Sequence, residues 1–316
     1  MRKILFVIIF LHIVLFINAQ NRVRNYEEQI SFIFNLSNKF TVYEMGTIYY
    51  SEHSYKMYKI TYNQSNANNK KFLIVSGIHG NEEAPVYALR DVILTLDSQE
   101  NALKNITVDF IYILNPYGFE HDSRYNGNGL NLSLDFIRVE SNEIQMLLNS
   151  IKDTQYTGVY DFHEHGNSKS FFLYYYTRKN KQLAIEITEM IKENNFTLEN
   201  EFVDVILKAR DGLIYIPLYA KWYYEYILRA ATTGIYFEKR NVKEVFVFEI
   251  PKLEDFLNRK TMAKILANYL LQEDRETIVE KNRVHINIIY IGIIIISIIC
   301  IGIIIKRKIG KRTNGA

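Results

Sequence analysis

Short apolar runs alternate with longer segments of helical periodicity along the middle of the chain. Apolar runs bounded by turn residues predict buried strands, and they lie at 71–76, 106–114, 157–162, 171–176 and 244–249. Segments in which apolar residues recur every three or four positions predict helices, and they lie at 83–96, 140–151, 181–193 and from the last strand to about residue 272. A tyrosine-rich stretch at 41–62, with a polar break at 51–54, predicts a hairpin. This alternation predicts an α/β sheet covered by helices on both faces.

Two further apolar segments lie at the ends of the chain. The first begins with Arg2 and Lys3, continues through an apolar stretch at 4–17, and has Ala19 before Gln20. This order is typical of a cleaved secretory signal peptide, which we assign to residues 1–19. An uncleaved anchor helix is the alternative, and the shortness of the apolar stretch disfavours it.

The second apolar segment, residues 286–305, is long enough to cross a membrane as a helix. It is apolar on every face, which disfavours a buried core helix as the alternative. The basic tail at 306–316 follows it directly. Because basic residues stay on the cytoplasmic side, we predict a single-pass cell-membrane protein with a cytoplasmic tail. Its extracellular domain would span 20–275, followed by a juxtamembrane segment at 276–285.

Composition narrows the class of protein further. The 316 residues are 48% hydrophobic and 23% charged, which is ordinary for a packed globular domain. The net charge is +3, and much of the excess lies in the tail, so we expect no nucleic-acid partner. The one cysteine, Cys300, lies inside the predicted span. The extracellular domain therefore lacks disulfides and cysteine ligands.

Polar clusters follow several predicted strands, where the sites of α/β sheets form. His79 and Glu82 lie in the turn between the strand at 71–76 and the next helix. Imidazole nitrogen and carboxylate oxygen are good zinc ligands. The alternative is that Glu82 or Glu83 only complements the positive end of the helix dipole.

A second cluster ends the strand at 157–162. Strand alternation places His163 on one face with Asp161 and His165. Either histidine could complete a set of three protein ligands, which leaves a catalytic zinc one open position. The unused histidine would then lie beside the site or at its rim.

Two more positions carry candidate chemistry. Glu249 ends the apolar strand at 244–249, and a buried carboxylate needs a partner because its unpaired burial is costly. A general base acting on water would meet that need, and a salt bridge to Lys or Arg is the alternative. Arg124 lies in a loop rich in Gly and Asn, where it could polarise a substrate oxygen or be only a solvated charge.

The strings GIHGNEEAP, NPYGFEHDSRYNGNGLNLSLDF, YDFHEHG and FVFEIP occur in that order between 72 and 250. In this order they resemble the zinc carboxypeptidase superfamily, and most closely its murein peptide amidase and succinylglutamate desuccinylase/aspartoacylase branches. The resemblance implies a mixed, mostly parallel eight-stranded sheet flanked by helices on both faces. It also implies one Zn²⁺ per chain held by His79, Glu82 and His163, with Glu249 as general base and Arg124 steadying the scissile carbonyl.

The chain departs from the family pattern in the loop after Arg124. The family's Gly-Val-Asp-Leu-Asn-Arg-Asn-Phe is here GLNLSLDF. The family's Asn-Arg pair, which binds a terminal carboxylate, has become Ser133-Leu134, and leucine makes no bidentate contact with a carboxylate. The family's Asp, which hydrogen-bonds a zinc-binding histidine, has become Asn131. We assign Asn131 and, as the substrate-side tyrosine, Tyr236 to substrate binding.

The sequence therefore predicts a membrane-anchored zinc metallopeptidase of carboxypeptidase type that hydrolyses an amide bond in extracellular or cell-wall peptides. A zinc-dependent deacylase of acylated amino acids is the first alternative. A catalytically degenerate, membrane-bound binding protein is the second. In either enzyme, Arg210 or Arg229 could replace the missing carboxylate-binding arginine from another loop.

Overall fold

A computed structural model describes residues 24–63, 69–99, 103–203 and 207–272. The predicted signal peptide at 1–19, the juxtamembrane segment at 276–285, the span at 286–305 and the tail at 306–316 lie outside these ranges. The chain divides into two compact units, residues 1–267 and residues 268–316. The first unit contains the sheet and every candidate site residue.

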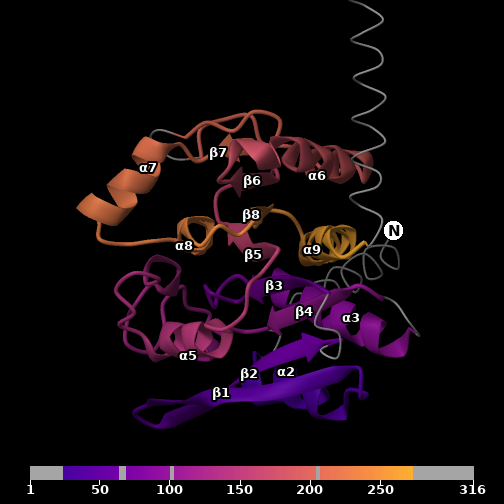
Figure 1. Ribbon diagram of the computed structural model, residues 1–316, viewed down its shortest axis with the longest axis vertical. Coiled ribbons are helices and arrows are strands. Elements are labelled where there is room, and N and C mark those ends of the chain that lie inside the picture. Colours follow the sequence, from indigo (N-terminus) through magenta and orange to yellow (C-terminus); the bar gives the residue numbers. More distant parts are fainter. Residues whose placement is uncertain (1–23, 64–68, 100–102, 204–206, 273–316) are drawn as a thin grey trace, which may run out of the picture. The chain divides into compact units, whose positions relative to one another are not determined.

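An eight-stranded sheet with the order β1-β2-β4-β3-β5-β8-β6-β7 forms the centre of the first unit (Figure 1). Its central strands β3, β5 and β8 are buried almost throughout, as expected for strands covered on both faces. The strands are β1 (Phe40–Tyr50), β2 (His53–Tyr62), β3 (Lys70–Ser76), β4 (Ile106–Ile111), β5 (Gly158–His165), β6 (Phe172–Tyr175), β7 (Leu213–Tyr215) and β8 (Glu244–Pro251).

Helices cover both faces of this sheet. Figure 1 shows α3 and α6 on one side of the central strands and α5 and α8 on the other. The α-helices are α2 (Tyr26–Ile30), α3 (Ala84–Ser98), α4 (Pro116–Glu120), α5 (Asn142–Ile151), α6 (Lys181–Glu193), α7 (Leu218–Trp222), α8 (Thr233–Lys239) and α9 (Phe256–Leu270). Short 3₁₀ turns occur at η1 (Ser31–Asn35), η2 (Leu132–Leu134) and η3 (Arg178–Asn180), and η4 (Tyr223–Ile227) is π-helical.

The predicted mixed sheet of eight strands is confirmed, but the prediction that it is mostly parallel was wrong. The pairs β3–β4, β3–β5, β5–β8 and β6–β7 are parallel, whereas β1–β2, β2–β4 and β6–β8 are antiparallel. A turn of only two residues joins β1 to β2, and such a short connection permits antiparallel pairing alone. The predicted hairpin is thus confirmed, and it brings antiparallel pairing to one edge.

The strand order places a reversal point beside β3. From β3 the chain first adds β4 on one side and then adds β5 on the other. Crossover connections keep one hand, so α3 and α5 lie on opposite faces of the sheet (Figure 1). In α/β sheets, ligands bind at the carboxyl ends of the strands beside such a reversal point, here β3 and β5.

Within the described ranges, none of the helices combines the length and apolarity that crossing a membrane requires.

Candidate metal centre

The loop after β3 positions His79 and Glu82. It turns through Gly77, whose φ of +64° suits glycine. It then passes so close to α4 that a Cβ on Gly80 would lie 1.8 Å from the carbonyl carbon of Gly118. Only glycine permits this backbone approach. The loop is therefore held against α4, and His79 is directed toward the end of β5.

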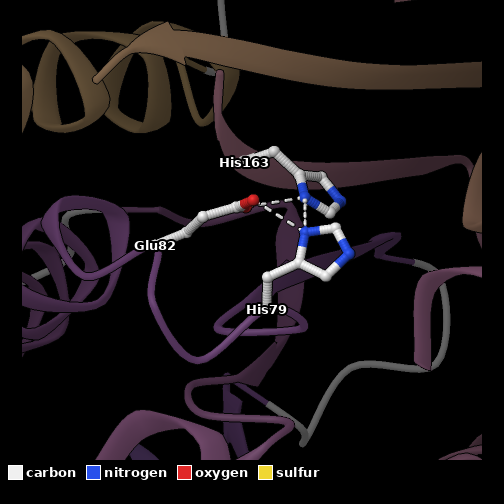
Figure 2. A group of neighbouring side chains, drawn as sticks. All are labelled: His79, Glu82 and His163. Atoms are coloured by element: carbon white, nitrogen blue, oxygen red, sulfur yellow. Dashed lines mark hydrogen bonds and ion pairs between the residues drawn. The ribbon is translucent and has the colours of Figure 1, made fainter. Parts of the chain in front are cut away.

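Three buried side chains from two elements meet at this point. His79 and Glu82 come from the loop after β3, and His163 comes from the end of β5 (Figure 2). The Nδ1 atoms of the two imidazoles lie 3.1 Å apart. The Glu82 carboxylate reaches both: Oε1 lies 2.7 Å from Nδ1 of His79, and Oε2 lies 2.8 Å from Nδ1 of His163.

This geometry fits a small tetrahedral cation. Ligand atoms about 2.0–2.1 Å from zinc stand about 3.3 Å apart, close to the separations within this cluster. Two imidazole nitrogens and one carboxylate oxygen form a donor set that zinc prefers at catalytic sites. The three predicted ligands are thus brought together by the fold, and together they could hold one Zn²⁺.

The charges inside the cluster depend on one another. Burial disfavours a charged Glu82, but His79 and His163 outweigh burial and lower the pKa of its carboxyl. Burial lowers the pKa of the His79 imidazole. Burial acts the same way on His163, but Asp161 and Glu82 outweigh it and raise its pKa well above the ordinary value. The carboxylates of Glu82 and Asp161 therefore favour a positive charge at this position.

Neighbouring side chains orient both histidines through their Nε2 atoms. Oδ2 of Asp161 lies 3.0 Å from Nε2 of His163. Oδ1 of Asn131 and Oγ of Ser133 lie 3.1 and 3.0 Å from Nε2 of His79. Such partners fix ring orientation and tautomer, which leaves the Nδ1 atoms free to bind metal. Asn131 therefore contacts a candidate ligand.

Glu249 lies one strand away from the cluster. In the parallel pairing of β5 with β8, Glu249 is directly opposite His163, so the two side chains project to the same face. Burial, reinforced by the negative charges of Glu82 and Asp161, raises the pKa of Glu249 to about 8. No Lys or Arg among the described residues forms an ion pair with this carboxylate. The salt-bridge alternative therefore finds no partner there.

Arg124 also faces the cluster. Its Nη1 lies 3.3 Å from Oε1 of Glu82, while 45% of its side chain remains exposed. A partly exposed guanidinium beside the ligands can reach a substrate and is more than a solvated charge.

Tyr236 lies elsewhere in the fold. It is on α8, where its ring lies 5.4 Å from the ring of Phe136 and 3.5 Å beneath the guanidinium of Arg240. No described contact links it to the histidines, so its assignment to the substrate stays a prediction. Arg210 forms an isolated backbone β-bridge with Leu213, and the carbonyl of Arg229 accepts a hydrogen bond from Arg138. The possible roles of these two arginines in binding a substrate carboxylate also stay predictions.

The geometry distinguishes the two histidines of the second cluster. His165 is partly buried with its ring 5.1 Å from Phe172, and it is outside the group of converging ligand atoms. His163 is therefore the ligand that the fold favours.

Sequence reasoning missed some of the supporting residues. Glu164 accepts from the backbone N–H of Ala84 at the start of α3 and pairs with Arg259 at 2.5 Å. Its own backbone N–H donates to Glu82. The position of Glu164 next to the candidate ligand His163 could have suggested a supporting role. Its partner Arg259, however, lies 95 residues away in the chain, so the sequence did not indicate the pairing.

Comparison with known proteins supports this interpretation of the site. Residues 68–201 match the family model of the succinylglutamate desuccinylase/aspartoacylase catalytic domain. That region contains the three candidate ligands and Arg124, and it ends before Glu249. A probable aspartoacylase from Prochlorococcus marinus subsp. pastoris is 42% identical over 78 residues, which make up 24% of this chain and 23% of that protein. The match thus spans about a quarter of the curated relative.

Solved structures share the fold over most of the chain. A candidate metallopeptidase from Shewanella denitrificans OS217 covers 77% of this chain and 86% of its own, with a TM-score of 0.63 at 18% identity. A metallo-carboxypeptidase from Burkholderia cenocepacia covers 78% of this chain and 67% of its own, with a TM-score of 0.57 at 14% identity. The family model over residues 68–201, the curated relative and the shared fold together support a zinc carboxypeptidase-like hydrolase.

Proposed function

We propose that this chain is a membrane-anchored zinc metallopeptidase of carboxypeptidase type that hydrolyses an amide bond in extracellular or cell-wall peptides. The observation that supports the chemistry most strongly is the meeting of His79, Glu82 and His163 within reach of one cation, with Glu249 opposite His163 on the next strand. A half-buried carboxylate of raised pKa beside a metal site is typical of a general base.

Zinc bound by the three ligands would supply Lewis acidity and would strengthen water as a nucleophile near neutral pH. Glu249 removes a proton from the attacking water, whose oxygen bonds to the amide carbon. Glu249 then delivers that proton to the leaving nitrogen as the C–N bond breaks. Arg124 donates to the carbonyl oxygen as negative charge develops there, a contribution often of about 3 kcal/mol per donor. Asp161 holds the His163 ring in place throughout.

The substrate side of the site differs from that of a typical carboxypeptidase. Leu134 stands where the family pattern has the arginine that binds a terminal carboxylate, and Ser133 turns toward His79. We therefore propose a substrate whose leaving group has no obligatory free carboxylate beside the scissile bond. A deacylase acting on acylated amino acids is the second candidate, and the match to the aspartoacylase-type family model favours it.

The proposed location rests on the sequence alone. A signal peptide at 1–19, a span at 286–305 and a basic tail at 306–316 would leave the hydrolase domain outside the cell. An extracellular domain meets peptides and cell-wall stems, which is why we place the peptidase before the deacylase.

A substrate panel tests this proposal directly. The full chain, purified in detergent with one equivalent of zinc, is assayed on matched peptides with free and amidated C-termini and on N-acetyl and N-succinyl amino acids. We expect hydrolysis of peptides with little preference for the free C-terminus, loss of activity on chelation, and recovery on adding zinc. Turnover confined to the acyl amino acids would establish the deacylase instead. Stoichiometric zinc with no hydrolysis of any amide would indicate a binding protein.

A further inference from the structure

An exposed apolar face lies on a segment that the zinc chemistry does not use. We define the arm as residues 218–228, comprising α7, η4 and Leu228. Figure 1 shows α7 at the margin of the fold, apart from the strands. The arm's outward side chains are large and uncharged: Leu218, Tyr219, Trp222, Tyr223, Tyr226 and Ile227. Each of them is at least 47% exposed.

The spacing of these residues makes one continuous stripe. Leu218, Trp222 and Tyr226 are four positions apart, and the rings of Trp222 and Tyr226 stack with centroids 5.9 Å apart. An α-helical turn holds slightly fewer than four residues, and a π-helical turn holds more. The change from α7 to the π-helical η4 therefore keeps residues four apart on the same side of the arm.

The arm's charged residues point the opposite way. Lys221 is buried, and its Nζ donates to Glu238 at 2.8 Å and to the carbonyl of Tyr176 at 2.7 Å. Glu225 pairs with Lys239 at 2.5 Å. A surface helix ordinarily turns its charges to water and its apolar residues to the core. This reversed arrangement marks the outer stripe as an interaction surface.

We propose that this stripe lies in the surface of a phospholipid bilayer. Trp and Tyr are the side chains that concentrate at membrane interfaces, because each combines an apolar ring with a polar group. Exposed Arg138 and Arg229 flank the stripe, and Arg138 donates to the carbonyls of Leu228 and Arg229. Their positive charges suit the phosphates of lipid headgroups.

The short length of chain between the described residues and the predicted membrane span also supports contact between the arm and a bilayer. Thirteen residues, 273–285, separate the end of the described chain from the apolar segment at 286–305. Fully extended, they reach about 45 Å. If that segment is the proposed anchor, this short connection tethers the domain to the membrane, and contact of the arm with lipid becomes an intramolecular event at high effective concentration.

The chain contains a single tryptophan, Trp222, so its fluorescence reports on this surface alone. The full-length protein is reconstituted at one copy per nanodisc in phosphatidylcholine, with and without bromine on the acyl chains. We expect blue-shifted emission, at least twofold quenching by brominated lipid, and weak quenching by aqueous acrylamide. Emission typical of an exposed tryptophan, unaffected by brominated lipid and strongly quenched by acrylamide, would refute the proposal.

If another protein surface covers the stripe in place of lipid, the fluorescence results should differ. A second copy of the chain would shift the emission only when two chains share a nanodisc, without bromine quenching, and this outcome would overturn the lipid assignment. A matched control moves the probe to the exposed hairpin in Trp222→Tyr/Tyr49→Trp, where brominated lipid should leave the emission unchanged. Equal quenching of the tryptophan in Trp222→Tyr/Tyr49→Trp would show that lipid contact is not specific to the arm, and it would contradict the proposal.

A second variant tests the stripe with the probe in place. In Leu218→Ser/Tyr226→Ser, Trp222 remains, and we expect bromine quenching to fall at least twofold while zinc content stays at that of the wild type. Undiminished quenching would contradict a role for the stripe. Because the readout needs no turnover, it is independent of the proposed hydrolysis. Failure of the chain to enter nanodiscs would refute the anchor, whereas incorporation without quenching would refute the docking.

Discussion

Polar side chains usually lie at the surface of a protein and large apolar side chains in its interior. The metal cluster departs from this rule by burying polar groups, and the arm departs from it by exposing apolar groups. Around His79 and His163, charged and polar side chains are buried at the end of the central strands. On the arm, apolar rings are exposed while Lys221 and Glu225 turn inward. Burying polar groups and exposing large apolar groups both cost stability unless a partner compensates.

The comparison shows two ways in which a fold can carry function. In the cluster, the compensation is partly present, because Glu82, Asp161 and Asn131 hydrogen-bond the histidines. On the arm, nothing within the described chain covers the rings. The cluster is therefore pre-organised for a small ion, whereas the arm needs a large apolar surface.

The strongest test of the cluster removes its proposed base. Glu249→Gln keeps the shape of the side chain but accepts no proton, so we expect kcat to fall by at least about 10³-fold, with zinc still bound. Steady-state kinetics and metal analysis measure both quantities. Glu189→Gln on the exposed face of α6 is the matched control. Turnover within tenfold of the wild type would exclude Glu249 as the base.

A histidine pair tests which imidazoles bind the metal. His163→Ala removes one of three converging ligands, and we expect zinc affinity to fall by at least about 10²-fold. Even the loss of a residue that only hydrogen-bonds a ligand typically lowers metal affinity by about 10- to 100-fold. His165→Ala should leave zinc affinity within about threefold, because His165 packs on Phe172 outside the cluster. Competition with a fluorescent chelator measures both constants. The reverse order of effects would transfer the ligand role to His165.

A smaller effect is expected from the carboxylate behind His163. Asp161→Asn keeps a hydrogen-bond acceptor near Nε2 but removes the charge, so we expect zinc affinity to fall by about 10- to 100-fold. The same chelator competition measures it. An unchanged affinity would mean that Asp161 does not act on the metal through His163.

The raised pKa of Glu249 has a consequence for metal-free protein. A carboxyl whose pKa rises from 4.5 to about 8 on folding stabilises the fold below pH 4.5, and this contribution is lost as pH rises toward 8. One pKa unit corresponds to about 1.4 kcal/mol, so a few kcal/mol are involved. Urea unfolding of the chelator-treated protein at pH 5 and pH 8 measures the change. In Glu249→Gln, the pH dependence over this interval should be weaker. An identical dependence would contradict the raised pKa of Glu249.

The arm should show the smallest effect on stability. The Leu218 side chain is already exposed to solvent. We therefore expect Leu218→Ser to change the free energy of unfolding in urea by at most about 0.5 kcal/mol. In contrast, Phe248→Ala in the buried strand β8 should cost about 3–5 kcal/mol. A loss above 2 kcal/mol in Leu218→Ser would mean that the arm packs against other parts of the chain.

Local patterns were sufficient to predict most of the fold. Apolar runs located β3, β5 and β8 within a few residues, because burial on both faces leaves a continuous apolar signal. Helical periodicity located α3, α5, α6 and α9, but not the short helices α4 and α8. The three-residue strand β7 and the arm were not predicted. The first is too short to carry a period, and the second reverses the usual polarity of a surface helix.

By itself, the sequence determined which side chains could bind a metal. His79 and Glu82 share one turn, and strand alternation put His163 on one face with Asp161 and His165, which are local relations that spacing encodes. Only the tertiary structure decided that His163, and not His165, meets His79, and that Tyr236 lies apart from them. Those outcomes depend on the parallel register of β3, β5 and β8, which brings together residues more than 80 positions apart. The packing of whole strands sets that register, and no single segment of the sequence specifies it.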